Sequence, residues 1–175
     1  MDERLLLSVN GLRGGWIDGL VTVLGEWGVY AFPAAMLALA LARPAAFAAM
    51  ARDGWLAWLL AFFVAEIVLK PLIGRPRPSA LPELLAQLRV LGPVPPARSL
   101  SMPSGSAAMA SAGAVWLWRH GRSRALGWSA IATAMAISVG RVVAGLHWPS
   151  DVAVGGALGL ALALAVERYG RWASR

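Results

Sequence analysis

A histidine and an aspartate stand four residues apart late in the chain, within the segment Gly-Leu-His-Trp-Pro-Ser-Asp. The Pro and Ser before Asp151 favour a helix start, where an acidic side chain suits the positive end of the helix dipole. Asp151 could accept a hydrogen bond from one nitrogen of His147, which would fix its tautomer and leave the other nitrogen free to attack. The plainer alternative is that Asp151 is only a helix-terminal charge and His147 an interfacial polar residue.

Cations precede this pair in the sequence. The segment Lys-Pro-Leu-Ile-Gly-Arg-Pro-Arg-Pro occupies residues 70–78 and begins where an apolar stretch ends. Lys70 and Arg77 could therefore hold an anion at a membrane surface, or they could simply anchor the helix end in the interface. A third cation, Arg141, precedes His147 by six residues.

A helix start lies between these segments. Residues 103–106 read Pro-Ser-Gly-Ser and open an alanine-rich stretch. Such residues are ordinary helix caps, but the free N–H groups of a helix start also form an anion site, here at Ser104, Gly105 and Ser106. With the cations and the His–Asp pair, this start supplies what phosphoryl transfer needs, namely donors for the equatorial oxygens and an in-line nucleophile.

The composition indicates what kind of elements position these residues. The 175 residues are 58% hydrophobic and 14% charged, against about 45–50% and about 25% in soluble domains. These values exclude a disordered chain and disfavour an ordinary soluble globule. The net charge of +7 is spread between long apolar segments, so a membrane is favoured over nucleic acid as the partner. Without cysteine, the chain has no disulfide or thiolate chemistry.

Apolar stretches predict an all-α fold, a polytopic transmembrane bundle formed by a single domain over residues 1–175. Five stretches approach the roughly 20 residues that a membrane-spanning helix needs. They occupy residues 20–42, 54–69, 103–118, 125–140 and 152–166. The charged start and the early glycines argue against a cleavable signal peptide, and residues 1–19 are predicted to form an interfacial helix and turn.

The basic residues predict an orientation. Short basic connections contain Arg43, Arg52 and the residues 119–124, and the tail adds Arg168, Arg171 and Arg175. The positive-inside rule places this face in the cytoplasm. The segments with the candidate chemistry then face the periplasm or exterior, in what we expect to be a bacterial inner membrane.

The ordered motifs resemble a known signature. They are similar to the three-part signature of the type 2 phosphatidic acid phosphatase superfamily. The first part is Lys, six residues and Arg-Pro, and the second is Pro-Ser-Gly. The third is Arg, five residues, His, three residues and Asp. The vanadium-dependent haloperoxidases are related to that superfamily. The motif core runs over residues 70–151, and the flanking apolar spans resemble its integral-membrane branch.

The resemblance implies a covalent phosphohistidine on His147, oriented by Asp151. It also implies that phosphate is held without metal or cofactor. The residues expected to hold it are Lys70, Arg77, Arg141, Ser104, Gly105 and Ser106. Two positions depart from the pattern. Ser106 stands where the family usually has a histidine that protonates the leaving group, and Gly140 stands where the third motif often begins with Ser.

We therefore expect a metal-independent lipid phosphatase or diphosphatase, most similar to small bacterial enzymes that convert undecaprenyl pyrophosphate to undecaprenyl phosphate. The alternatives are a lipid phosphotransferase that uses the same intermediate and a catalytically silent module that binds or transports lipid phosphates. The lipid bilayer and a lipid phosphate are the expected partners, and the oligomeric state stays open. Two membrane carboxylates, Glu26 and Glu66, are further candidates. Glu66 precedes Lys70 by one helical turn and is predicted to orient it.

Overall fold

The computed structural model describes residues 1–11, 14–42, 44–92, 96 and 98–173. Helices dominate these residues, and one isolated β-bridge joins Pro76 to Leu100. The α-helices are α1 (Asp2–Asn10), α2 (Gly15–Trp27), α3 (Ala31–Ala42), α4 (Pro44–Phe62), α5 (Lys70–Ile73), α6 (Pro82–Leu85), α7 (Gly105–His120), α8 (Arg124–Val143) and α9 (Pro149–Ala173). The connecting helical turns are η1 (Gly28–Tyr30), η3 (Pro78–Ala80) and the π-helical η2 (Phe63–Leu69).

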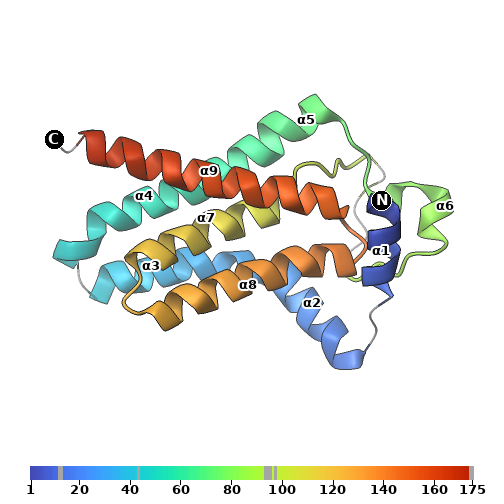
Figure 1. Cartoon of the computed structure of the whole chain (residues 1–175), viewed down its shortest axis with the longest axis horizontal. Coiled ribbons are helices and arrows are strands. Elements are labelled where there is room, and N and C mark those ends of the chain that lie inside the picture. Colours follow the sequence, from blue (N-terminus) through green and yellow to red (C-terminus); the bar gives the residue numbers. More distant parts are fainter. Residues whose placement is uncertain (12–13, 43, 93–95, 97, 174–175) are drawn as a thin grey trace.

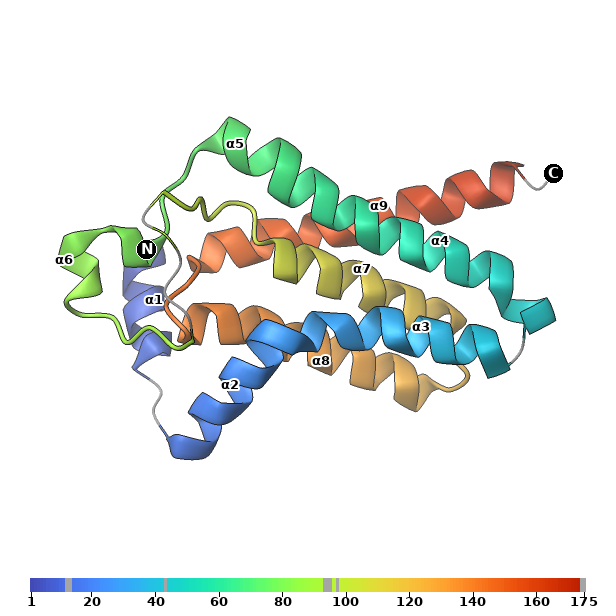
Figure 2. The same cartoon turned by 180° about the vertical axis from the view of Figure 1, so that it is seen from behind.

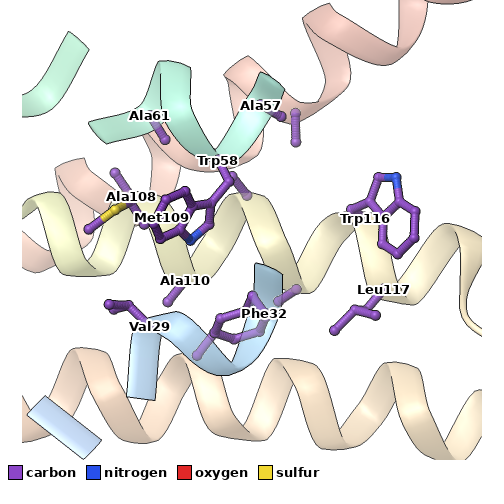
Figure 3. Packing of buried hydrophobic residues seen from close by; sticks show 14 of the residues in the cluster. Val29, Phe32, Ala57, Trp58, Ala61, Ala108, Met109, Ala110, Trp116 and Leu117 are labelled. Carbon is purple, nitrogen blue, oxygen red and sulfur yellow. The ribbon is translucent and has the colours of Figure 1, made fainter. Parts of the chain in front are cut away.

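Helix α7 forms the centre of the bundle. It packs against α9, α8, α4 and α3, and most of its residues are buried. Figures 1 and 2 show these helices running along the long axis of the molecule, with α1 and α6 across one end. The core around α7 contains Phe32, Trp58 and Met109, which Figure 3 shows between α3, α4 and α7.

Two glycines of α9 allow it to approach the backbone of α7. A Cβ at Gly155 would collide with the carbonyl oxygen of Ser104, and a Cβ at Gly159 would collide with that of Ala108. Small residues at such spacing let membrane helices pack at short distance. We call this contact the glycine seam. It holds the start of α7 against the start of α9, because the backbone N–H of Ser104 donates to the carbonyl of Asp151 at 3.0 Å.

The α8–α9 side is packed less closely. A cavity of about 430 Å³ lies there, with α7 on its third side. Its lining is mainly apolar and includes Val115, Ile131, Met135 and Leu160. Thus α9 contacts α7 through backbone atoms and leaves space beside α8.

Four helical stretches of the described chain are long and apolar enough to cross a membrane. They are Gly15–Ala42, Ala51–Ile73, Arg124–Val143 and Pro149–Gly170. The all-helical, membrane-embedded character predicted from composition is thus confirmed. The third predicted span corresponds to α7, which has only 16 residues.

The N-terminal region differs from the prediction of an interfacial helix and turn over residues 1–19. Helix α1 ends at Asn10, and α2 begins at Gly15, so residues 15–19 belong to a candidate span. Helix α1 also packs into the protein. Leu6 is fully buried, and the Asn10 side chain donates to the carbonyls of Arg89 and Val143. The sequence could not reveal these partners because they are remote along the chain.

Candidate active site

His147 and Asp151 face each other in the interior at the α8–α9 end of the bundle. Both are buried, and Nδ1 of His147 lies 3.5 Å from Oδ2 of Asp151. The connection between the helices turns through Gly145, whose φ of +71° favours glycine. The backbone N–H groups of Leu146 and His147 both donate to the carbonyl of Arg141, which holds the histidine backbone in place.

The other ring nitrogen of His147 faces a cation. Nη1 of Arg77 lies 3.2 Å from Nε2 and donates to the carbonyl of Leu146 at 3.0 Å. A guanidinium only donates hydrogen bonds, so this geometry assigns an unprotonated Nε2 and a proton on Nδ1, the tautomer that Asp151 would select. Nε2 is therefore the nitrogen with a free electron pair, and it lies beside a buried arginine.

Charge and burial keep the ring neutral. Burial is the main cause that lowers the pKa of His147 from 6.5 to about 3, while the nearby carboxylate of Asp151 acts to raise it. Arg77, Arg141 and Lys70 lower this pKa further. Burial also lowers the pKa of Arg77 from its ordinary value. A neutral imidazole among cations is suited to attack an anionic electrophile.

Lys70 stands at the end of the π-helical segment η2. It is buried, and its Nζ lies 2.6 Å from both carboxylate oxygens of Glu66. The predicted pairing of Glu66 with Lys70 is thus present. Such π-helical segments are often found at functional sites.

The start of α7 supplies the expected helix N-terminus. Ser104 is fully buried, and its Oγ accepts a hydrogen bond from the N–H of Ala107 at 3.4 Å. The hydroxyl thus acts as a helix cap, the plainer of the two roles considered for it. Gly105 lies against Glu66, because a Cβ at this position would collide with Oε1 of Glu66. Ser106 follows in the first turn and is partly exposed.

Arg141 is near the site but points toward α2. Its Nη1 donates to the carbonyl of Gly25 at 3.1 Å and lies 3.9 Å from the carboxylate of Glu26. This identifies a partner for Glu26. The positive charge of Arg141 still acts on the pKa of Arg77 and of His147, so it contributes to the field of the site.

Arg75 and Asp2 also belong to this site, although neither was predicted from the sequence. Nη1 of Arg75 donates to Oδ1 of Asp151 at 2.8 Å, and its Nη2 lies 2.7 Å from Oδ2 of Asp2. Asp2 also accepts hydrogen bonds from the backbone and the hydroxyl of Ser150. The guanidinium of Arg75 lies 4.9 Å from the ring centroid of Trp148. Arg75 could have been found as the first arginine of Arg-Pro-Arg-Pro, but no sequence signal pointed to Asp2.

The site thus combines a neutral imidazole with several cations at one end of the bundle. Lys70, Arg77, His147 and Asp151 all lie there, together with the N-terminus of α7. Cations and helix N-terminal N–H groups bind phosphate oxygens, while Nε2 of His147 can attack phosphorus. Within the described ranges, no group of three or more His, Asp or Glu side chains converges to form a metal site.

Comparisons with known proteins concern the family and the fold. The family model described as the PAP2 superfamily matches residues 54–175. The crystal structure of LpxE from Aquifex aeolicus is 27% identical, with a TM-score of 0.77, over 95% of this chain and 94% of that chain. A PAP2-type phosphatidylglycerolphosphate phosphatase from Bacillus subtilis is 21% identical, with a TM-score of 0.71, over 97% of this chain and 84% of that chain. No curated protein matches the sequence significantly.

Proposed function

The chain belongs to the PAP2 superfamily, and from this premise we propose that it is a membrane lipid phosphatase that works through a phosphohistidine on His147. One observation carries the proposal. Nε2 of the buried, neutral His147 lies 3.2 Å from the guanidinium of Arg77, so a phosphate bound to Arg77 would place its phosphorus within reach of the nucleophile.

The reaction has two displacements. Nε2 of His147 attacks phosphorus, the bond to the leaving oxygen breaks, and the phosphoryl group stays on the ring. Asp151 stabilises the positive charge that the imidazole gains. Water then attacks the phosphohistidine and releases inorganic phosphate. Lys70 and Arg77, together with the start of α7, stabilise the phosphoryl oxygens in both steps, which supports a reaction that needs no metal.

The substrate is a lipid phosphate or pyrophosphate, and our first choice is the pyrophosphate of a polyprenyl carrier such as undecaprenyl. Ser106 supports that choice, because its hydroxyl is a poor proton donor. An alkoxide leaving group is as basic as hydroxide, whose conjugate acid has a pKa near 15.7, so it needs a proton. A lipid phosphate leaving group, with a relevant pKa near 6, departs without one.

We also propose the placement in the membrane. Helix α7 would cross the membrane in addition to the four candidate spans, which gives five spans in all. Its 16 residues at about 1.5 Å each extend about 24 Å inside the bundle. The site would face the periplasm or exterior of a bacterial inner membrane. That orientation follows from the basic connections, of which Arg43 and Arg175 lie outside the described residues.

Purified protein in detergent, given a panel of lipid monophosphates and pyrophosphates, tests the function by phosphate release. The wild type should release phosphate and retain a radiolabelled phosphoryl group, while His147→Ala should do neither. Transfer of the label to an added lipid alcohol would identify a phosphotransferase. Binding without release or labelling would identify a silent lipid-phosphate module. Unchanged release by His147→Ala would overturn the mechanism.

A further inference from the structure

Glu66 has a carboxylate inside the anion-binding part of the site. Both of its oxygens lie 2.6 Å from Nζ of Lys70, and Oε1 lies against Gly105 at the start of α7. The charge of Glu66 also acts on the cations Arg77 and Arg141. Glu66 therefore lies against Lys70 and the helix start, two of the groups proposed to hold phosphate.

A bound phosphate changes the surroundings of Glu66. It competes for Lys70, and it brings a second anion against the carboxylate. The repulsion between two anions at close range favours the uptake of a proton by one of them. The Glu66 side chain is 29% exposed, against 8% for Lys70, so it is the more accessible member of the pair.

Three other carboxylates near the site have partners of their own, and one of them, Glu26, lies beside Arg141. Asp151 is fully buried and accepts hydrogen bonds from Arg75 and from the backbone of Trp148. Asp2 binds Arg75 and Ser150. Glu66 comes from η2, whereas His147 comes from the α8–α9 connection, so the two reach the site from separate elements. In-line displacement requires the nucleophile and the proton donor for the leaving oxygen to approach phosphorus from different directions.

Resting on the proposed phosphatase activity, we propose that Glu66 is the proton donor for the leaving oxygen and extends the substrate range to lipid phosphate monoesters. Protonated Glu66 gives its proton to the leaving oxygen as the ester P–O bond breaks and the bond from phosphorus to Nε2 of His147 forms. The products of this step are the lipid alcohol, the phosphohistidine and the Glu66 carboxylate. Water then attacks phosphorus and the P–N bond breaks, which releases phosphate carrying the protons of the water and restores neutral His147. A proton from solvent returns Glu66 to its acid form.

A structural role for Glu66 makes a different prediction. If the carboxylate only positions Lys70, its loss should slow the cleavage of every phosphate substrate by a similar factor. A proton donor matters only where the leaving group is a strong base. The dependence of turnover on the leaving group therefore separates the two roles.

The experiment measures phosphate release from a prenyl monophosphate and from the matched prenyl pyrophosphate. Glu66→Gln keeps the size of the side chain and a hydrogen-bond acceptor for Lys70. It should lower monophosphate turnover by about 100-fold, a typical effect of losing a general acid, and change pyrophosphate turnover little. Glu66→Asp keeps the acid and should retain the monophosphate activity in part. Glu83→Gln, an exposed glutamate of α6, is the matched control and should change neither rate.

The outcomes are distinguishable. An equal loss on both substrates, or no loss on either, would overturn the role of Glu66 while leaving the phosphatase in place. If Glu66→Gln fails to fold, a Glu66→Asp variant with equal losses on both substrates would overturn it as well. A folded wild type that cleaves neither substrate would refute the proposed function and this inference with it.

Discussion

Nη1 of Arg75 lies 2.8 Å from Oδ1 of Asp151, and Oδ2 of the same carboxylate faces His147. Arg75 thus holds the group that orients the proposed nucleophile. Arg75→Ala should lower kcat by about 10- to 100-fold, with little change in KM. Losses of this size follow when the residues that hydrogen-bond to metal-binding histidines and orient them are removed. Arg75→Lys should recover part of the loss because it keeps the charge. Steady-state kinetics measure both effects.

Arg89→Ala provides a control for the loss of a positive charge, because Arg89 pairs with Asp18 on α2 instead. It should leave kcat near the wild-type value. A rise in KM alone for Arg75→Ala would contradict the positioning role and indicate substrate binding.

His147 should stay neutral throughout the physiological pH range. Its pKa in the folded protein is about 3, against 6.5 for an unperturbed histidine. Between these values the unfolded chain binds a proton that the folded protein does not, so the free energy of unfolding should fall as the pH drops below about 6.5. Nitrogen NMR of a His120→Gln variant, which leaves His147 as the single histidine, measures the titration of the His147 ring in the folded protein. A ring that titrates near pH 6.5 in the folded protein would contradict the buried, cation-surrounded geometry.

Metal removal should not affect turnover. Lys70 and Arg77 are proposed to supply the positive charge that magnesium supplies in other phosphoryl-transfer enzymes. Dialysis against a strong chelator, followed by a phosphate-release assay, should therefore give the activity of the untreated protein. Loss of activity that added magnesium restores would argue against the proposed transition-state stabilisation.

The two ends of the bundle should label from opposite sides of the membrane. The chain has no native cysteine, so Gln87→Cys in the connection after α6 and Arg122→Cys between α7 and α8 each introduce one thiol. Both positions are exposed. An impermeant thiol reagent applied to intact spheroplasts should label position 87 only. Labelling at position 122 alone would invert the proposed orientation.

The glycine seam should tolerate no added methyl group. Gly159→Ala would place a Cβ against the carbonyl oxygen of Ala108, and main-chain atoms yield little. Overpacking of this kind costs about 1–3 kcal/mol, and the same seam holds Ser104 against Asp151, so both Tm and turnover should fall. Gly156→Ala on the same helix meets nothing within 4 Å and should preserve both. Thermal unfolding in detergent and phosphate release distinguish the two variants.

The sequence could predict most of the candidate site because its residues are fixed by local order. Lys70 and Arg77 follow one apolar stretch of the sequence directly. His147 and Asp151 stand four residues apart, where the last two apolar stretches meet. Helix ends on one side of a bundle must then meet. The motif spacing therefore carried much of the three-dimensional information.

Contacts made by side chains far apart in sequence could not be predicted in this way. Asp2 reaches Arg75 and Ser150 only because α1 packs across the end of the bundle. The direction of Arg141 toward Gly25 depends on how α2 leans against α8. Hydropathy indicates that a helix is buried, but it does not indicate which neighbour the helix contacts.

The glycine seam and the cavity beside it give α9 one stiff side and one compliant side. Backbone already meets backbone between α7 and α9, so an increase in the lateral pressure of the bilayer cannot bring these helices closer. The space of about 430 Å³ between α8 and α9 can shrink instead. Changes in lipid composition should therefore displace α8 relative to α9, while the distance from Ser104 to Asp151 stays constant. The fold thus keeps the start of α7 in register with Asp151, the residue that orients the proposed nucleophile, when the membrane around it changes.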